Sequence, residues 1–376
     1  MNNKIRVALV GPIDTKGRYS GGIASILNTL IASEDLSESI LEVIPFDTCR
    51  ISRDKYSAGG LNLDNVRNAI ISAKQLRNIL RDKQPDILYF NSSRGYALIK
   101  DLLLIAHATK KIQCKTILHI HFANAETIIP AGSIFKKLFL YLLEKTISHI
   151  VLLSKNTKEQ LETWGIKEKK MSVIYNFHNI NVSEAEIYKK ASLVNKKNPK
   201  DVIFIGSLDE RKGILDLLKA IECVSSSVRV HICGEAKQKE IEIQINELIA
   251  RITGKEIILH GFVTGEEKTN LLLSSDIMIL PSYGEGFPLV LLEGLAAGCA
   301  IITTDVGAIP EVFSDCNGKI IEPGDIEGIK NAIEQISSSK NLQKIMVENK
   351  ELSKKYTVSE FISNIEAVCK RVMYES

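Results

Sequence analysis

Hydrophobic and polar positions along the chain follow one recurring pattern: a short apolar run, a polar or glycine-bearing loop, and a segment with apolar residues at helical spacing. In the first half the runs cover residues 5–11, 86–90, 115–121 and 149–154, and the helical segments after them cover 22–33, 97–111, 133–147 and 155–165. Runs that are apolar almost throughout are typical of strands buried on both faces of a parallel sheet. Because each run is followed by a helical segment, the pattern predicts an α/β fold.

The alternation restarts after a polar stretch. Residues 176–200 are rich in Lys and Asn and carry a proline near their end, which is typical of a connection. The later apolar runs cover 202–208, 228–234, 256–263, 276–282, 299–305 and 318–323. With 376 residues, the chain is longer than a domain built around a single hydrophobic core usually is. We therefore expect two doubly wound domains over 1–178 and 200–355, a linker over 179–199, and a C-terminal helix over 356–376 that packs back on the first domain.

Composition and charge exclude several classes of protein. The chain is 45% apolar and 25% charged, as ordinary globular proteins are. Lys and Arg number 48 and Asp and Glu 45, so the net charge of +3 gives no support to a nucleic-acid partner. No uncharged apolar run approaches the ~18 residues of a membrane-spanning helix. The opening MNNKIRVALVGP holds too short an apolar block for a signal peptide, and we expect a cytoplasmic protein.

The cysteines and the acidic residues predict neither a disulfide framework nor a metal site. The seven cysteines are scattered and form no CxxC motif, which is typical of small buried hydrophobic residues in a reducing compartment. No cluster has the spacing of metal ligands, and no DxD-type acidic pair follows a strand. We expect no metal and no other cofactor.

The most informative stretch is PSYGEGFPLVLLEGLAAGCAIITTDVGAIPE, residues 281–311. It follows a strand, and Pro288 suits the first turn of a helix because the N–H that proline lacks would be unpaired there anyway. The backbone amides of Leu289 and Val290 would then point out of the N-terminus of the helix. Such a terminus is a ready site for a phosphate group.

Two glutamates flank this helix start. Glu285 and Glu293 are eight positions apart, and in a continuous helix their backbones would be separated by ~12 Å, at about 1.5 Å per residue. That disfavours the paired carboxylates of a hydrolase, which lie ~5–9.5 Å apart, and favours two separate hydrogen-bonding roles on a polyhydroxylated ligand. In isolation the same spacing would fit one capping carboxylate and one solvated glutamate. The surrounding EGFP and TTDVGAIPE favour the binding roles.

Segment 202–311 resembles the nucleotide-sugar domain of the retaining glycosyltransferases of family 4, also called glycosyl transferases group 1. Their GT-B fold consists of two Rossmann-like domains facing a central cleft, and their hallmark is Glu-x7-Glu, here within PSxxEGFPLxxLE. The resemblance implies that Glu285 contacts hydroxyls of the donor sugar and that Glu293 contacts the ribose of the nucleotide. It also implies that amides around Phe287, Leu289 and Val290 hold the donor sugar and its phosphate.

A second match is GSLDERKG, residues 206–213, directly after the first strand of the second domain. The family pattern has Gly-Arg-Leu, three variable residues and Lys-Gly, with both basic residues facing the diphosphate of the donor. Lys212 falls on the lysine position, whereas Ser207 stands at the arginine position. Arg211 could supply the missing charge, but neighbours at a helix start point in different directions, which favours Lys212. A cation here would stabilise the charge of a leaving diphosphate; the alternative is a solvated surface pair.

The first domain supplies weaker candidates. Gly21 and Gly22 open a helix, and in the family a Gly-Gly pair at this place lets the backbone approach the donor phosphates. A glycine-rich surface loop is the alternative. In residues 115–121 the period of two places His119 and His121 on one face, and the resemblance implies that a histidine near the end of this strand faces the donor sugar. His121 is our candidate, with His119 as a second candidate or a core residue.

Three residues in loops after strands are candidates for acceptor contacts: Arg18, Ser93 and Arg94. The helical segment 133–147 carries Lys136, Lys137 and Lys145 among Phe and Leu. This is typical of a core-packed helix with a lysine-bearing solvent face. The sharper hypothesis is peripheral attachment to anionic lipid at the inner face of the cytoplasmic membrane.

Together the motifs predict a hexosyltransferase that moves a sugar from a nucleoside-diphosphate donor to a hydroxyl of a glycan or lipid-linked acceptor, in bacterial cell-surface polysaccharide or glycolipid biosynthesis. The resemblance implies retention of configuration, with Lys212 at the leaving diphosphate and Glu285 and His121 at the sugar. Two alternatives stay open. One is a sugar-nucleotide epimerase or phosphorylase on the same fold, and the other is a non-catalytic subunit that binds the donor for a partner enzyme, which Ser207 keeps open.

Overall fold

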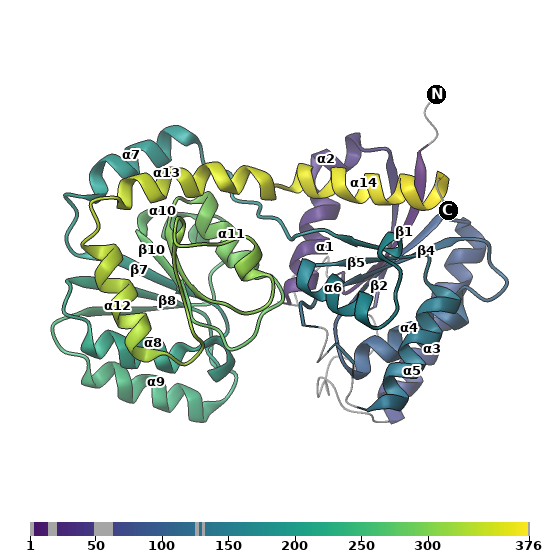
Figure 1. The fold of residues 1–376 in the computed structure, drawn as a ribbon, viewed down its shortest axis with the longest axis horizontal. Coiled ribbons are helices and arrows are strands. Elements are labelled where there is room, and N and C mark those ends of the chain that lie inside the picture. The colour runs from purple at the N-terminus through teal and green to yellow at the C-terminus, as the bar shows by residue number, and fades with distance from the viewer. Residues whose placement is uncertain (1–3, 14–20, 49–62, 125–127, 130–131, 375–376) are drawn as a thin grey trace. The chain divides into compact units, whose positions relative to one another are not determined.

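Two sheets, each between layers of helices, organise the chain (Figure 1). The computed structural model describes residues 4–13, 21–48, 63–124, 128–129 and 132–374, and for residues 63–70 the backbone alone. The chain divides into two units, which we call unit 1 (residues 1–176 and 358–376) and unit 2 (residues 177–357). The prediction of an α/β fold with two doubly wound parallel sheets is confirmed.

The described strands of unit 1 form a six-stranded parallel sheet in the order β2-β1-β3-β4-β5-β6. Their bounds are β1 Ile5–Gly11, β2 Leu41–Asp47, β3 Ile87–Ser92, β4 Lys115–Ile120, β5 His149–Leu152 and β6 Met171–Val173. The strand order reverses between the neighbours β1 and β3. In open α/β sheets ligands bind outside the carboxyl ends of the strands at such a reversal.

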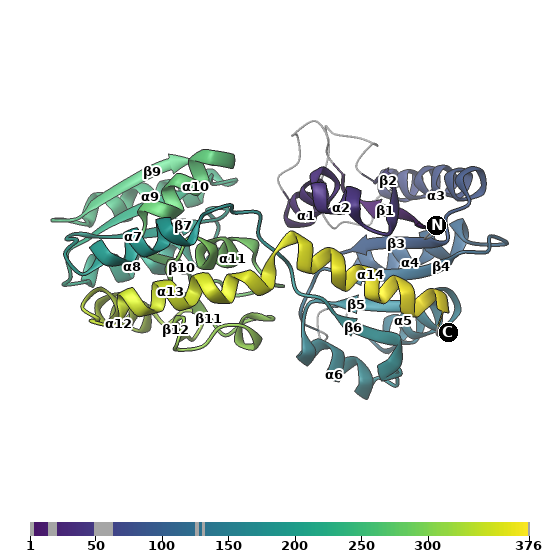
Figure 2. The same ribbon diagram turned by 90° about the horizontal axis from the view of Figure 1, so that it is seen from above.

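Helices cover both faces of this sheet (Figure 2). One face carries α3 (Leu63–Lys83), α4 (Tyr96–Ala108) and α5 (Ser133–Thr146), which pack side by side. The other carries α1 (Gly22–Ala32), α2 (Glu34–Glu38) and α14 (Val358–Tyr374). Helix α6 (Lys155–Thr163) and the 3-10 turn η2 (Glu168–Lys170) connect β5 to β6.

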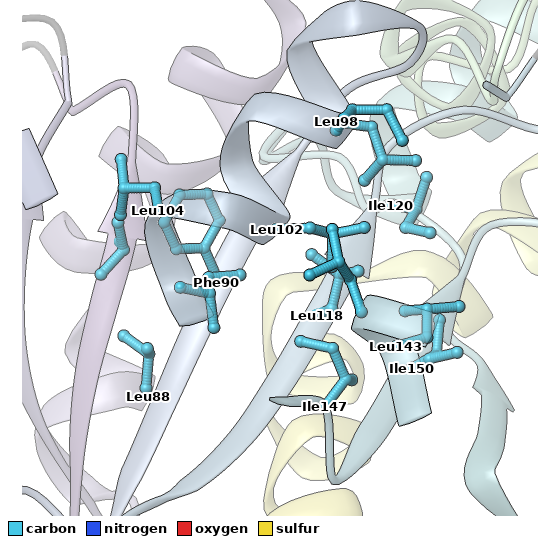
Figure 3. Close-up of a cluster of buried hydrophobic side chains, with 14 of the residues drawn as sticks. Leu88, Phe90, Leu98, Leu102, Leu104, Leu118, Ile120, Leu143, Ile147 and Ile150 are labelled. Atoms are coloured by element: carbon cyan, nitrogen blue, oxygen red, sulfur yellow. The ribbon is translucent and has the colours of Figure 1, made fainter. Parts of the chain in front are cut away.

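Strand side chains in unit 1 alternate between these two faces. Figure 3 shows one of them, where side chains of β3 and β4 pack against side chains of α4 and α5. The strand residues are Leu88, Phe90, Leu118 and Ile120, and the helix residues are Leu98, Leu102 and Leu143. Intervening residues such as Tyr89 and His119 point to the other face, where the ring of Phe361 in α14 lies 6.2 Å from the ring of His119. The C-terminal helix is thus part of the core of unit 1.

The described strands of unit 2 form a second six-stranded parallel sheet, in the order β12-β11-β10-β7-β8-β9. Their bounds are β7 Lys200–Ile205, β8 Val228–Cys233, β9 Glu256–Gly261, β10 Ile277–Leu280, β11 Ala300–Thr304 and β12 Gly318–Ile321. The order reverses between β7 and β10, so the loops after these two strands lie at the place where such sheets bind ligands.

The helices of unit 2 also form two layers (Figure 1). One layer holds α8 (Ile214–Cys223), α9 (Lys239–Arg251) and α12 (Ile326–Ser337). The other holds α7 (Glu184–Val194), α10 (Gly265–Ser274), α11 (Leu289–Ala296) and α13 (Leu342–Ser353). Short 3-10 turns are η3 (Glu210–Lys212), η4 (Ile309–Glu311) and η5 (Lys354–Tyr356).

The prediction of a linker over 179–199 is wrong. Unit 2 begins at Phe177, and most of the segment forms α7, which opens with a capping box between Ser183 and Glu186 and packs on α13. The buried face of α7 consists of only Ile187, Ala191 and Val194, so its composition is polar although it belongs to the core of unit 2.

The chain passes between the units twice, near residues 176 and 357. On the unit 2 side the two passages run together, because the amide of His178 donates to the carbonyl of Tyr356 at 2.9 Å. Within the described part of the chain, no helix has the length and apolar character needed to cross a bilayer.

Candidate functional site

In unit 2 the loops after β7 and β10 meet where the strand order reverses. The loop after β7 contains η3, and the loop after β10 covers residues 281–288. The amide of Tyr283 donates to the carbonyl of Arg211 at 2.8 Å, which joins the two loops through the backbone. Across this junction the ammonium of Lys212 lies 2.6 Å from Oε1 of Glu285. Two residues singled out from separate motifs are therefore in direct contact.

Local backbone chemistry places Lys212 at this junction. Oδ1 of Asp209 accepts a hydrogen bond from the amide of Lys212 at 3.0 Å, which caps η3. Gly213 follows with φ of 71°, a conformation that favours glycine, and a Cβ there would lie 2.1 Å from the carbonyl oxygen of Pro281. The two loops approach each other closely because this residue has no side chain.

Ser207 supports the same turn. Its hydroxyl donates to Oδ2 of Asp209 at 2.6 Å, so the residue at the family's arginine position holds the carboxylate that caps η3. Arg211 is exposed, and its guanidinium donates to the carbonyl of Gly284 at 3.0 Å. Adjacent residues of η3 therefore have different partners.

Glu285 is enclosed by donors. Oε1 receives the hydroxyl of Ser282 at 2.7 Å as well as the ammonium of Lys212. The side chains of Lys212 and Glu285 are only 15% and 8% exposed, so the ion pair is poorly screened by solvent. A Cβ on Gly307 would lie 2.4 Å from the carbonyl oxygen of Glu285, so the backbone of segment 307–308 packs directly against this loop.

The second glutamate of the motif lies in α11 and has a different partner. Glu293 is buried, and its Oε1 accepts from the ammonium of Lys268 in α10 at 2.6 Å. Its Oε2 is buried and has no hydrogen-bond partner among the described residues. A buried polar atom without a partner costs ~1–3 kcal/mol, so this oxygen is a candidate to receive a hydroxyl of a ligand.

Helix α11 begins at Leu289, and the expectation that Pro288 lies in its first turn is wrong by one residue. Pro288 is the extended residue before the helix, with φ of −73° and ψ of 125°. Leu289 and Val290 are the first residues of the helix, where backbone amides have no carbonyl four residues back within the helix. The side chain of Phe287 is buried, with its ring centre 6.4 Å from that of Phe313.

In unit 1, the ends of β1, β3 and β4 bring Asn91 and His121 together. Asn91 lies near the end of β3, and its Nδ2 donates to the carbonyl of Val10 in β1 at 3.0 Å. Oδ1 of Asn91 lies 2.8 Å from Nε2 of His121, directly after β4. The amide of His121 donates to the carbonyl of Ser92 at 2.9 Å.

His119 is a core residue of unit 1. It is fully buried, its Nδ1 lies 3.0 Å from the hydroxyl of Tyr89, and its ring centre is 4.0 Å from that of His121. Burial lowers the pKa of His119 well below its usual range and the pKa of His121 to about 3. Both imidazoles are therefore neutral near pH 7.

Among the described residues, the other candidates of unit 1 form no hydrogen bond or ion pair with Asn91 or His121. Gly22 is the first residue of α1, and a Cβ there would have nothing within 4 Å. Ser93 and Arg94 are exposed, and the guanidinium of Arg94 lies 4.3 Å from the centre of the Phe122 ring. Arg18 lies outside the described residues.

The lysines of α5 differ in their surroundings. The ammonium of Lys136 lies 4.4 Å from the centre of the Trp164 ring, so this lysine packs on unit 1 itself. Lys137 and Lys145 are exposed, as are Ile134 (77%) and Tyr141 (57%). Phe139, Leu142 and Leu143 form the buried face of the helix.

Four residues of these arrangements were not singled out from the sequence: Asn91, Asp209, Lys268 and Ser282. Asn91 carried a usable signal, because it is a polar residue at the end of an apolar strand. Lys268 carries no such signal in the sequence, since its partner Glu293 is 25 residues away along the chain. Within the described residues, no three His, Cys, Asp or Glu side chains are grouped so as to hold a metal ion.

Comparisons with known proteins match both halves of the chain. The family described as "Glycosyl transferases group 1" matches residues 186–353, and the family described as "Glycosyltransferase Family 4" matches residues 32–182. The chain is 26% identical over 361 residues to the uncharacterized glycosyltransferase MJ1178 of Methanocaldococcus jannaschii, covering 93% of this chain and 94% of that protein.

Two further proteins are similar. The capsular polysaccharide biosynthesis glycosyltransferase CapM of Staphylococcus aureus is 25% identical over 263 residues, which cover 64% of this chain and 67% of CapM. The crystal structure of Anabaena Alr3699/HepE in complex with UDP and glucose superposes with a TM-score of 0.68 over 97% of this chain and 99% of that one, at 16% sequence identity. At this identity the likeness shows a shared fold.

Proposed function

The chain belongs to the family 4, or group 1, glycosyltransferases of the GT-B fold, and from this premise we propose that it transfers a hexosyl group from a nucleoside-diphosphate sugar to an acceptor hydroxyl. The observation that carries the proposal is the contact between Lys212 and Glu285 at 2.6 Å, at the strand reversal of unit 2. The contact supports the proposal because a cation suited to a diphosphate lies beside a carboxylate suited to sugar hydroxyls. A solved relative by fold, HepE, holds UDP and glucose, which supports this class of donor.

Each member of the pair has a role in the proposed reaction. Without a ligand, Lys212 and Glu285 neutralise each other. When the donor binds, its diphosphate takes the place of Glu285 beside Lys212, and sugar hydroxyls donate to the carboxylate. The departing diphosphate gains negative charge as the glycosidic bond breaks, and a fixed cation in a poorly solvated site stabilises that charge. The unpaired Oε2 of Glu293 would receive a ribose hydroxyl of the nucleotide.

We further propose retention of anomeric configuration and transfer without a metal ion. The resemblance to the family supports both, and Lys212 with the first amides of α11 would supply the positive charge that a metal supplies elsewhere. The acceptor would be a glycan or a lipid-linked sugar of a cell-surface polysaccharide or glycolipid, which the capsular role in the name of CapM supports. The protein would work in the cytoplasm, with α5 touching the inner face of the membrane.

A thermal-shift screen against UDP-, GDP-, ADP- and CMP-sugars tests the donor class first. The purified chain should be stabilised by one base class and should slowly hydrolyse the stabilising donor. Transfer assays with EDTA present should retain full activity, and the anomeric proton coupling of the product should report retention.

Each rival function has its own signature in these assays. Stabilisation without hydrolysis or transfer would point to a non-catalytic donor-binding subunit. An isomerised sugar would point to an epimerase, and a sugar phosphate formed with inorganic phosphate would point to a phosphorylase. Stabilisation by no nucleotide sugar at all would contradict the proposal.

A further inference from the structure

In unit 1, a short chain of hydrogen bonds allows only one assignment of donors and acceptors. Asn91 is buried and bridges the carbonyl oxygen of Val10, at 3.0 Å, and Nε2 of His121, at 2.8 Å. A carbonyl oxygen only accepts hydrogen bonds, so the amide nitrogen of Asn91 must face Val10. The amide oxygen of Asn91 consequently faces His121.

The tautomer of His121 follows from this orientation. Because Oδ1 of Asn91 only accepts, Nε2 of His121 must carry the proton and donate it. In a neutral imidazole the other ring nitrogen then has a free lone pair. Burial keeps the imidazole neutral, since it lowers the pKa of His121 to about 3.

The lone pair on Nδ1 has no partner within the described part of the chain. This atom is buried, and no described residue donates a hydrogen bond to it. The ring is held in place by the His119 ring at 4.0 Å and by the hydrogen bond from its own amide to Ser92. An oriented, neutral and unpaired acceptor at the carboxyl end of a central strand is suited to receive a hydroxyl group.

We propose that Asn91 is a positioning residue, which holds His121 as the Nε2–H tautomer so that Nδ1 accepts a hydrogen bond from a hydroxyl of a sugar substrate. The nature of the ligand rests on the proposed function, whereas the tautomer rests on the hydrogen-bond chain alone. The hydroxyl can belong to the donor sugar or to the acceptor. Either source presents the same chemistry to Nδ1, and kinetics separates them.

The first test measures the tautomer in the ligand-free protein. Long-range proton–nitrogen NMR correlations of histidine-labelled protein should show His121 protonated at Nε2 and unchanged from about pH 5.5 to about pH 8. Asn91→Leu, which removes the acceptor at similar size, should give a mixture of tautomers. His149, on β5 of the same unit and bonded to Ser172 rather than to Asn91, should not change and serves as the internal reference. Protonation of Nδ1 in the wild-type protein would overturn the proposal.

The second test separates the two ring nitrogens by activity. The side-chain oxygen of His121→Asn can occupy the place of Nδ1, whereas His121→Gln mimics Nε2. We expect the Asn variant to keep more transfer activity than the Gln variant, and Asn91→Leu to lower kcat/KM ~10-fold, the value of one such hydrogen bond. Asn91→Asp, which keeps the oxygen acceptor, should recover part of the loss. The same two substitutions at His149 control for buried histidines as such.

A hydroxyl of the donor and a hydroxyl of the acceptor predict different kinetic results. If the hydroxyl belongs to the donor, the His121 variants slow donor hydrolysis without acceptor; if it belongs to the acceptor, they raise only the KM for the acceptor. A Gln variant as active as the Asn variant would reject Nδ1 as the acceptor. Absence of any transfer by the wild-type protein would reject the proposed function, while the NMR result would still decide the role of Asn91.

Discussion

One carboxylate oxygen of Glu285 receives both the ammonium of Lys212 and the hydroxyl of Ser282. We expect replacement of either charged residue to lower activity. Replacement of both should lower the free energy of unfolding by less than the two single replacements added together. Removing one partner of a buried pair leaves the other charge without compensation, whereas removing both leaves none. This contrast separates a catalytic pair from a merely structural one.

Lys212→Gln and Glu285→Gln should each lower kcat/KM by roughly 100-fold or more, because each removes charge at the proposed donor site. Each should also lower the free energy of unfolding, and the double variant should regain part of that stability without regaining activity. Transfer assays and urea unfolding measure the two effects. Lys197→Gln removes an ammonium that pairs with both Asp201 and Asp276 in the same unit and should cost stability alone. Wild-type turnover in Glu285→Gln would contradict the assignment.

The motifs identify Glu285, Glu293 and Lys212, but not the contact between Lys212 and Glu285 or the one between Lys268 and Glu293. The partner of Lys212 is 73 residues away along the chain, and the two meet because β7 and β10 are neighbours in the sheet. No spacing rule encodes such a contact. For the same reason Lys268 beside Glu293 could not be predicted, although each residue is visible in the sequence.

Among the elements, the turn between η3 and α8 depends most on a single residue. Gly213→Ala would place a methyl group 2.1 Å from the carbonyl oxygen of Pro281, at a φ of 71°. We expect the free energy of unfolding to fall by ~2 kcal/mol or more. Gly22→Ala has open space around the new methyl group and should not lower stability. Urea denaturation of both variants makes the comparison, and equal stability would show that the turn relaxes freely.

Gly22→Ala also reports on the role proposed for that residue. A glycine required by packing would not tolerate the change, and one required by a ligand would fold normally but bind the donor more weakly. The expected result is therefore an unchanged melting temperature with a raised KM for the donor. An unchanged KM would assign Gly22 to an ordinary helix start.

Helix α5 carries the proposed membrane contact, and the structure selects the lysines to test. Lys137 and Lys145 are exposed, while Lys136 lies over Trp164. Lys137→Glu with Lys145→Glu should abolish flotation with anionic vesicles, since each basic residue near such a surface contributes about 1 kcal/mol. The control is Lys167→Glu with Lys169→Glu, two exposed lysines at η2. Binding that is insensitive to salt, or absent from the wild type, would leave α5 as a core-packed helix.

Element prediction succeeds where apolar runs are nearly continuous and fails where polar or exposed residues interrupt them. The runs predicted for β3, β4, β8 and β10 match these strands within one or two residues, because the strands are buried on both faces. Helix α7 has the polar composition of a linker because only three of its residues are buried, and these three suffice to hold it against unit 2. Strand β2 received no prediction; it lies at the edge of the described sheet, where Pro45 is tolerated.

Across the whole molecule, several buried histidines link stability to pH. Burial lowers the pKa of His121 to about 3 and that of His149 to about 4, and it also lowers the pKa of His119 and His178. In the unfolded chain these groups titrate near pH 6.5. As the pH falls below that value the unfolded chain binds protons that the folded chain does not, so acid favours unfolding.

The free energy of unfolding should therefore decrease from about pH 6.5 toward pH 4, by ~1.4 kcal/mol per pH unit for each such histidine. Asp101 opposes this trend, because burial raises its pKa in the folded chain. The folded chain then binds this proton at a higher pH than the unfolded chain does, which adds to the free energy of unfolding as the pH falls. Urea unfolding at pH 7 and pH 5 measures the difference, and His149→Gln should reduce the slope by the share of one histidine. Stability that is equal or greater at pH 5 would contradict the prediction.

Helix α14 is the last described segment of the chain, yet it belongs to the unit whose other residues come first. Its Ile362 and Ile365 line a small apolar cavity together with Val7, Leu9 and Tyr89 of the central strands. During translation, unit 1 leaves the ribosome early but lacks this helix until all of unit 2 has been made. The nascent sheet thus keeps part of an apolar face uncovered until α14 has been made. A chain that stops after residue 357 would contain all of unit 2 but would leave the part of this face that α14 covers exposed.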